Sequence, residues 1–336
     1  MFAHKVEINT TQPQELAGFH DIYSPKAIPD TEPIPITKAG DRIGQPFMPC
    51  PKEKLIAVVE CNIPDGTRDV APIDDSARKM AEHLLRFLEN EQKSGRLPKK
   101  LPPIQSGVGA VANAVLSGLL NSNLSGLCLY SEVLQDSVID LIDAGKVDFA
   151  SATALTLSPQ KQKYFNANIE KYRPFIILRP EEISNSPEVI RRLGVISINT
   201  ALEADLSGNV NSTHVKGTKL MNGLGGSGDF TRNASVSIFT TASTAKNGSC
   251  TCIVPFVSHV DHTEHDVNVI ITEQGIADLR CLDPYERAAT IIQNCVHPNY
   301  REKLQEYVDI SYARSNSKHG IAPNLLIFES GGVIRF

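Results

Sequence analysis

Short apolar runs that alternate with amphipathic segments constrain this chain most. An apolar run of four to eight residues suits a buried strand, whereas apolar residues three and four apart suit a helix. Helices are predicted over residues 75–95, where Asp75 or Ser76 can cap the start and Gly95 the end, and over residues 133–145. This alternation predicts an α/β fold with a largely buried sheet. The predicted strands are KLIAVVECNI (54–63), LCLY (127–130), FIILRP (175–180), VISINTA (195–201), SVSIF (235–239), CTCIVPFV (250–257) and VNVIIT (267–272).

Composition narrows the class of protein. With 336 residues the chain can bury one large core or two moderate ones. A net charge of −5 argues against a nucleic-acid-binding surface, and no apolar run approaches the roughly 20 residues that a membrane span needs. The seven cysteines are scattered through apolar stretches and are predicted to be reduced, small buried side chains. These features are typical of a globular protein in a reducing compartment.

Residues 218–228, TKLMNGLGGSG, are too rich in glycine for a helix or a regular strand, because glycine loses the most backbone entropy on folding. The run from Gly225 to Gly228 can direct unhindered backbone N–H groups at a negatively charged oxygen. A flexible surface turn is the alternative interpretation of such a run.

Two further segments contain candidate site residues. QSGVGAVANAVLSGL (105–119) is typical of a strand end that leads into a helix, where free N–H groups favour anions. It is not a dinucleotide-binding fingerprint, because Ala112 replaces the third glycine. In YSEVLQD (130–136), Glu132 follows a predicted strand, at the end of an open α/β sheet where ligands bind. A charge at a helix start is the alternative role for Glu132, and Glu203 is a second candidate carboxylate.

Three histidines recur at every third residue in VSHVDHTEHDV: His259, His262 and His265. With the acidic residues between them, they could ligate zinc. The segment also reads as a polar connector between two predicted strands. We favour a loop that brings histidines to the rim of the active site, and we predict no metal ligands.

Four motifs together resemble the acetyl-CoA hydrolase/transferase family of class I CoA-transferases: GVGAVANAV (107–115), YSEVLQD (130–136), NSTHVKGTKLMNGLGGSGDFTRNA (211–234) and ITEQGIADLR (271–280). Fungal acetyl-CoA hydrolases are expected to be the most similar members. The resemblance implies an open α/β sheet with helices on both faces. It also implies an enzyme of acetate metabolism that hydrolyses acetyl-CoA, or transfers coenzyme A between succinyl-CoA and acetate. Coenzyme A is then a substrate, and no cofactor is required.

The resemblance assigns roles to individual residues. Glu132 aligns with the family's nucleophile, which attacks the acyl-CoA carbonyl and then carries CoA as a glutamyl thioester. This alignment favours Glu132 over Glu203. The backbone N–H groups of Val108 and Gly226 match the oxyanion hole.

The resemblance also implies residues that bind the substrates. Asn185 and Glu273 are expected to bind the acyl or carboxylate substrate. The residues expected to contact coenzyme A are Gly107, Val108, Gly109, Ala110, Val111, Leu202, Gly226 and Lys246.

Class I CoA-transferases are similar to one another in having two tandem α/β domains with the active site between them. Residues 1–70 are expected to be the end of the first domain and a linker, and residues 71–336 the second, C-terminal domain. The chain thus looks like a fragment that lacks most of the N-terminal domain. The alternative function is a non-catalytic CoA-binding fragment or a regulatory paralogue. The family implies a homodimer when full length, in the cytoplasm or the mitochondrial matrix, and we identify no targeting signal in this chain.

Overall fold

The computed structural model describes residues 6–9, 18–49, 51–54, 57–61, 73–107 and 109–314. Its main feature is an eight-stranded sheet in the order β19-β18-β14-β9-β3-β4-β6-β8. Neighbouring strands are parallel, except that β19 is antiparallel to β18. The strands are β3 (Ile104–Ser106), β4 (Leu127–Tyr130), β6 (Val147–Ala152), β8 (Ile176–Leu178), β9 (Ile196–Thr200), β14 (Val236–Thr240), β18 (Val269–Thr272) and β19 (Gly275–Asp278).

The order of the strands reverses at the centre of the sheet. From β3 the chain adds β4, β6 and β8 on one side, and then returns to place β9 on the other side of β3. It continues outward through β14, β18 and β19. Adjacent connections therefore leave the sheet in opposite directions at β3 and β9, which opens a crevice at the carboxyl ends of the strands.

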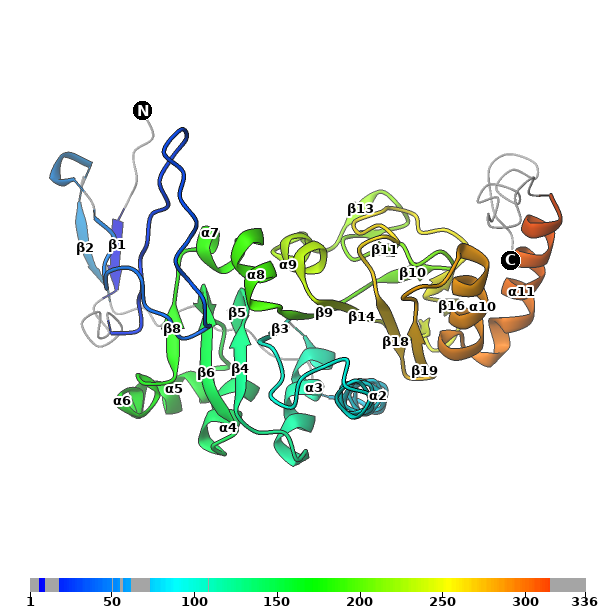
Figure 1. Ribbon diagram of the computed structural model, residues 1–336, viewed down its shortest axis with the longest axis horizontal. Coiled ribbons are helices and arrows are strands. Elements are labelled where there is room, and N and C mark those ends of the chain that lie inside the picture. Colours follow the sequence, from blue (N-terminus) through cyan, green and yellow to red (C-terminus); the bar gives the residue numbers. More distant parts are fainter. Residues whose placement is uncertain are drawn as a thin grey trace.

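Helices cover both faces of the sheet, as the sequence predicts (Figure 1). Helices α2 to α6 pack on one face, and α7 to α11 on the other. The helices are α2 (Asp75–Lys93), α3 (Ala110–Asn121), α4 (Asp136–Asp143), α5 (Pro159–Ala167), α6 (Ile169–Tyr172), α7 (Glu181–Ser184), α8 (Pro187–Leu193), α9 (Ser227–Asn233), α10 (Pro284–Cys295) and α11 (Pro298–Arg314), with a 3₁₀ turn, η1, at Lys52–Lys54.

The central strands are buried on both faces of the sheet, and buried polar residues such as Ser197 and Ser237 lie among their apolar ones. In β14, Ile238 packs in the core beneath α2 and α3, and the next residue, Phe239, packs in the core beneath α10. In β18, Ile270 and Ile271 divide between the same two cores. Successive side chains of a strand point to opposite faces, so a strand covered on both sides reads as a continuous apolar run.

Within the described ranges, short strands form five smaller sheets. The chain pairs β10 with both β11 and β17, and each of the other four sheets has two strands. These strands are β1 (Val6–Asn9) with β2 (Val58–Cys61), β5 (Val133–Leu134) with β7 (Ala154–Leu155), β10 (Glu203–Asp205) with β11 (Val210–Asn211) and β17 (Ile253–Val254), β12 (His214–Val215) with β13 (Lys219–Leu220), and β15 (Thr244–Ala245) with β16 (Cys250–Thr251).

Four sequence predictions need correction in their details. Asp74, not Asp75 or Ser76, caps α2, because its side chain accepts a hydrogen bond from the N–H of Ala77. Helix α4 begins at Asp136, three residues later than predicted, because β5 occupies residues 133–134.

The other two corrections concern a segment predicted as one strand and a segment predicted to have no helix or strand. The predicted strand 250–257 divides into β16 and β17, which belong to different small sheets. The glycine-rich segment 218–228 contains the short strand β13 and, from Ser227, the first residues of α9. The β12–β13 hairpin therefore precedes Gly223, Gly225 and Gly226 in the sequence, and α9 follows them.

Residues 18–49 pack against the β8 edge of the sheet. Phe19 is fully buried in the core beneath helices α2 to α6. A parallel bridge joins His20 to Leu178 of β8. Asp21 forms a buried ion pair with Arg179. The expected domain boundary near residue 70 remains a prediction.

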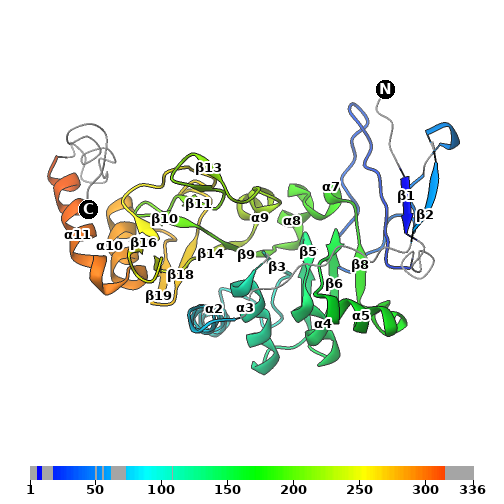
Figure 2. The ribbon, with the colours of Figure 1, turned by 180° about the vertical axis from the view of Figure 1, so that it is seen from behind.

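Figures 1 and 2 show this segment and α11 at opposite ends of the elongated molecule. Among the helices described by the structure, none is long and apolar enough to cross a membrane.

Candidate functional site

A cavity of about 770 Å³ opens at the carboxyl ends of the central strands, where the strand order reverses. Gly107 follows β3, Glu132 follows β4, and Ala201 and Leu202 follow β9; all of them line the cavity. Residues 221–227, here called the glycine loop, form the opposite wall. The sequence prediction that Glu132 lies where open sheets bind ligands agrees with this position.

Glu132 is the one charged side chain among the described residues that line the cavity. Its Oε2 accepts a hydrogen bond of 2.7 Å from the backbone N–H of Gly226. Its backbone carbonyl accepts hydrogen bonds from the N–H groups of Thr153 (2.9 Å) and Ala154 (3.2 Å). The carboxylate is therefore held at a fixed place in the cavity wall.

Gly226 lies where no side chain fits. A Cβ atom at this position would lie 2.6 Å from Nδ2 of Asn185 and 2.7 Å from Oε2 of Glu132. Asn185 follows the last turn of α7 and is 6% exposed, and its Oδ1 is buried without a hydrogen-bond partner. The structure thus brings together Glu132, Gly226 and Asn185, three of the residues predicted for the site.

Gln135 forms hydrogen bonds to both Gly107 and Gly109, although the sequence analysis did not select it. Its Nε2 donates to the carbonyl oxygen of Gly107 (3.0 Å), and its Oε1 accepts from the N–H of Gly109 (3.3 Å). Val108, predicted to supply an oxyanion donor, lies outside the described residues. The only sequence signal for Gln135 is its place three residues after Glu132, and a search for charged or nucleophilic groups overlooks an amide.

A buried polar network joins β3 to β9 beside the cavity. Gln105 donates from Nε2 to Oδ1 of Asn199 (3.0 Å), and its Oε1 accepts from the hydroxyl of Ser197 (2.8 Å). Gln105 and Asn199 both line the cavity. Because each of these polar groups has a partner, the network can fix β3 and β9 at the crevice.

The predicted coenzyme A contacts fall into two groups. Gly107, Gly109, Leu202 and Gly226 line the cavity. The remaining described residues do not: Ala110 and Val111 form the start of α3, and Lys246 is exposed in the turn between β15 and β16. A role in binding coenzyme A remains a prediction for all of them.

The other two candidate carboxylates lie outside the cavity wall. Glu273, at the end of β18, accepts hydrogen bonds from the N–H of Ser243 (2.9 Å) and from Nε2 of Gln274 (3.0 Å). Burial raises the pKa of Glu273, but a hydrogen bond from the Ser243 hydroxyl, together with these two, outweighs it and keeps the pKa below its usual value. Glu203 accepts from Nδ2 of Asn211 (2.8 Å) and from the N–H of Ser258 (2.7 Å). Its carboxylate therefore ties two loops together.

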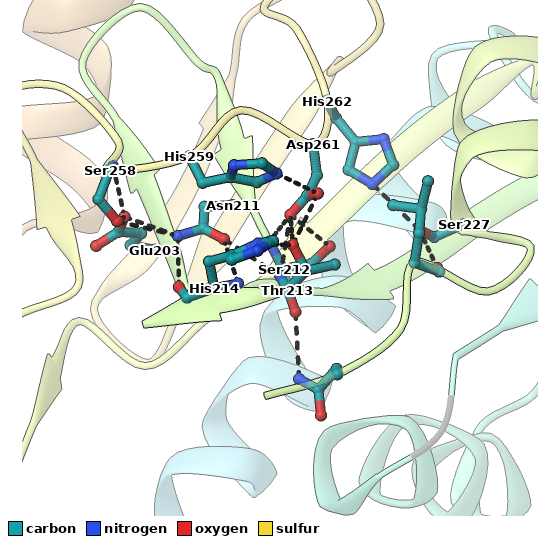
Figure 3. A network of polar contacts seen from close by, with 12 residues as sticks. Glu203, Asn211, Ser212, Thr213, His214, Ser227, Ser258, His259, Asp261 and His262 are labelled. Carbon is teal, nitrogen blue, oxygen red and sulfur yellow. Dashed lines mark hydrogen bonds and ion pairs between the residues drawn. The ribbon is translucent and has the colours of Figure 1, made fainter. Parts of the chain in front are cut away.

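The three regularly spaced histidines separate in the fold, and Figure 3 shows that two of them, His259 and His262, have different neighbours. His262 is buried and contacts Ser227 of the glycine loop, whereas His265 is exposed. The His259 ring instead lies 3.9 Å from that of His214, beside Asp261. One donor atom from each of His214, His259 and Asp261 lies within 4.8 Å of the others.

These three side chains are already engaged within the protein. The Asp261 carboxylate accepts from the N–H groups of Ser212 (2.8 Å) and Thr213 (2.9 Å), and the Thr213 hydroxyl contacts Nδ1 of His214 (2.7 Å). His262 does not line the cavity but contacts Ser227, which does, so the expectation of a loop that brings histidines to the rim of the active site stays a prediction.

Comparison with known proteins shows the family. Residues 162–308 match the model of the acetyl-CoA hydrolase/transferase C-terminal domain. A succinyl-CoA:acetate CoA-transferase of Clostridium kluyveri is 54% identical over 94% of this chain and 59% of its own length. An acetyl-CoA hydrolase of Candida albicans is 46% identical over 93% of this chain and 60% of its own length. The chain therefore spans about three fifths of these relatives.

Solved structures show the same fold. RipA from Yersinia pestis superimposes with a TM-score of 0.65 at 28% identity, over 76% of this chain and 57% of RipA. A 4-hydroxybutyrate CoA-transferase from Porphyromonas gingivalis gives a TM-score of 0.59 at 24% identity, over 77% of this chain and 61% of its own.

The comparisons correct one expectation. The bacterial transferase is more similar to this chain than the Candida albicans hydrolase, so the fungal hydrolases do not rank first. The family itself is as the motifs predict. The chain belongs to the acetyl-CoA hydrolase/transferase family.

Proposed function

We propose that the protein containing this chain is an acetyl-CoA hydrolase or CoA-transferase that carries CoA on Glu132 as a glutamyl thioester. One observation carries this proposal. The Glu132 carboxylate is the single charged group among the described lining residues, and the N–H of Gly226 donates to it at 2.7 Å. A carboxylate held against a substrate carbonyl and shielded from bulk water can act as a nucleophile.

The proposed reaction has three steps. Glu132 attacks the acyl carbonyl, the C–S bond breaks, and CoA leaves as a thiolate from a mixed anhydride. The thiolate then attacks the glutamyl carbonyl of this anhydride, which releases the free carboxylate and leaves the glutamyl-CoA thioester. Water or a second carboxylate attacks the thioester last. Water restores Glu132 and protonates the thiolate to give free CoA. A carboxylate instead forms a new anhydride, from which CoA recovers the new acyl group.

The Gly226 N–H is suited to the later steps in particular. It already donates to an oxygen of Glu132 itself. When the thiolate or water attacks the glutamyl carbonyl, that oxygen becomes an oxyanion. A fixed donor at this oxygen stabilises the charge as it develops, and loss of one such donor typically costs about 10²–10³ in rate.

The names of the relatives support the substrate class. The Clostridium kluyveri protein is a succinyl-CoA:acetate CoA-transferase, and the Candida albicans protein is an acetyl-CoA hydrolase. We propose acetyl-CoA, succinyl-CoA and acetate as substrates here, in acetate metabolism. The chemistry requires neither a metal nor a bound cofactor. We also propose that a first domain, outside residues 71–336, completes the site.

A turnover assay tests this function. The protein extended to the length of its relatives is incubated with acetyl-CoA, with and without succinate, and free CoA and succinyl-CoA are measured. We expect one or both products, and we expect their loss in Glu132→Gln. The matched control, Glu203→Gln, should keep activity because Glu203 lies outside the cavity wall. Turnover by Glu132→Gln at the rate of the unmodified protein would contradict the proposal.

A further inference from the structure

His262 is buried beside the glycine loop, although the proposed reaction makes no use of it. Its side chain is 4% exposed, and its ring packs against Phe239 of β14 with the centroids 4.9 Å apart. Its backbone N–H and carbonyl both pair with Val210 of β11. Both the backbone and the ring of His262 are therefore held in place, and the ring can in turn hold a side chain that it contacts.

The imidazole contacts the glycine loop through Ser227. Its Nε2 lies 3.1 Å from the Ser227 hydroxyl, which donates to the carbonyl oxygen of Leu224 at 2.8 Å. A hydroxyl has one proton, and a carbonyl oxygen can only accept. Both contacts are hydrogen bonds only if Nε2 of His262 carries a proton and donates to Ser227. Burial lowers the pKa of His262, although Asp261 and Asp266 oppose this effect, so the neutral form is favoured.

The neighbouring residue, Asp261, holds the other end of the glycine loop (Figure 3). Its carboxylate accepts from the N–H groups of Ser212 and Thr213. The carbonyl of Thr213 in turn accepts from the N–H of Met221 at 2.8 Å. Two consecutive residues, Asp261 and His262, thus fix the two ends of the segment that contains Gly226.

We propose that His262 is a positioning residue, which holds Ser227 and thereby keeps the Gly226 N–H directed at Glu132. The inference rests on the proposed function for its effect on catalysis. Its structural part is independent of that function, because the hydrogen bonds exist without substrate. Gly226 precedes Ser227 directly, so a displacement of Ser227 would also move the Gly226 N–H that donates to Glu132.

The structural part is tested on this chain with His262→Phe, which keeps a ring against Phe239 but removes the donor. We expect the Gly226 amide to exchange with solvent about fivefold faster, as for the loss of one neutral hydrogen bond. His262→Gln, which keeps an N–H donor, should recover part of the protection. His265→Phe is the matched control on the same loop and should leave exchange unchanged. In the unmodified chain, the ¹⁵N shifts of His262 should report the Nε2–H tautomer.

The catalytic part is tested on the protein at the length of its relatives. His262→Phe should lower kcat about fivefold and leave KM for acetyl-CoA unchanged, because one transition-state donor is misdirected. Unchanged exchange at Gly226 in His262→Phe, or an Nδ1–H tautomer, would overturn the inference. If exchange responds as expected but the unmodified protein has no turnover, the proposed function fails while the positioning of Gly226 stands.

Discussion

At the scale of single residues, the site depends on a close approach between a backbone and a carboxylate. The N–H of Gly226 reaches Oε2 of Glu132 because residue 226 has no side chain, and the space that a Cβ would need is filled by Asn185 and Glu132. Three chain segments far apart in sequence therefore meet within hydrogen-bonding distance.

Gly226→Ala should displace both neighbours of the new methyl group. We expect kcat to fall by about 10²–10³ with a smaller change in the affinity for CoA, because the lost donor acts mainly on the oxyanion. Gly223→Ala is the matched control: it lies in the same loop and lines the cavity, but its Cβ would meet no atom within 4 Å. Steady-state kinetics and CoA titration of both variants check this. Equal losses in the two variants would show that the loop only needs flexibility.

The sequence predicts some of these residues better than others. Glu132 and Gly226 are selected only through the family that the motifs resemble, because a strand-end carboxylate and a glycine run alone also fit a charge at a helix start and a surface turn. Gln135 and His262 act through hydrogen bonds to segments 28 and 35 residues away. No local pattern encodes such pairs, so only the fold shows them. Spacing also groups His259 with His265, whereas the fold pairs His259 with His214.

At the scale of secondary structure elements, apolar runs predict β4, β8, β9, β14 and β18, but they miss β6 and β19, whose sequences VDFASA and GIAD contain too few apolar residues in succession. They predict the short strands poorly. Cys250–Thr251 and Ile253–Val254 belong to one predicted strand, yet they pair with different partners. The chain bends at Cys252, so β16 pairs with β15 and β17 pairs with β10. The distinction depends on tertiary contacts that the run does not contain.

Helix α2 is joined to the end of β19 by a buried carboxylate. Glu91 of α2 is 2% exposed and accepts from Nη2 of Arg96 (2.6 Å) and Nη1 of Arg280 (2.9 Å). The hydrogen bonds from Arg96, together with those from Arg280, lower the pKa of Glu91 to about 2, although burial opposes this.

Glu91 should make the stability of this chain sensitive to acid. Because the pKa is depressed in the folded state, its contribution is present above pH ~4.5 and is lost as the pH falls towards 2. A depression of this size corresponds to about 3 kcal/mol. Glu91→Gln should therefore flatten the free energy of unfolding between pH 5 and 2, measured by urea titration. Glu89→Gln, on the exposed side of α2, should keep the slope, and an unchanged slope in Glu91→Gln would contradict the assignment.

At the scale of the whole molecule, the site results from the topology of the sheet. The crevice exists because β4 and β9 lie on opposite sides of β3, and the cavity is lined by residues that follow all three strands. The α/β class follows from the sequence alone, but the strand order does not, because alternation specifies no neighbours. The motifs predict the strand order only through the family that they resemble.

Residues 18–49 cover the β8 edge of the sheet, and a buried ion pair joins this segment to the residue that follows β8. Arg179 and Asp21 are 0% and 1% exposed, and Arg179 also donates from Nε to the Ser151 hydroxyl at 2.8 Å. Asp21→Asn should destabilise this chain by about 3–5 kcal/mol, because it leaves the guanidinium buried without a counter-charge. Thermal or urea unfolding measures this. Asp30→Asn, exposed in the same segment, is the control, and equal stability of the two variants would show that the edge packs without the ion pair.

The most direct test of the central claim is to locate the CoA adduct. The protein at the length of its relatives is incubated with acetyl-CoA, the thioester is reduced with borohydride, and the peptides are mapped by mass spectrometry. We predict that the reduced glutamyl side chain lies at Glu132 and is absent in Glu132→Gln. Modification at Glu203, or turnover without modification of Glu132, would contradict the account.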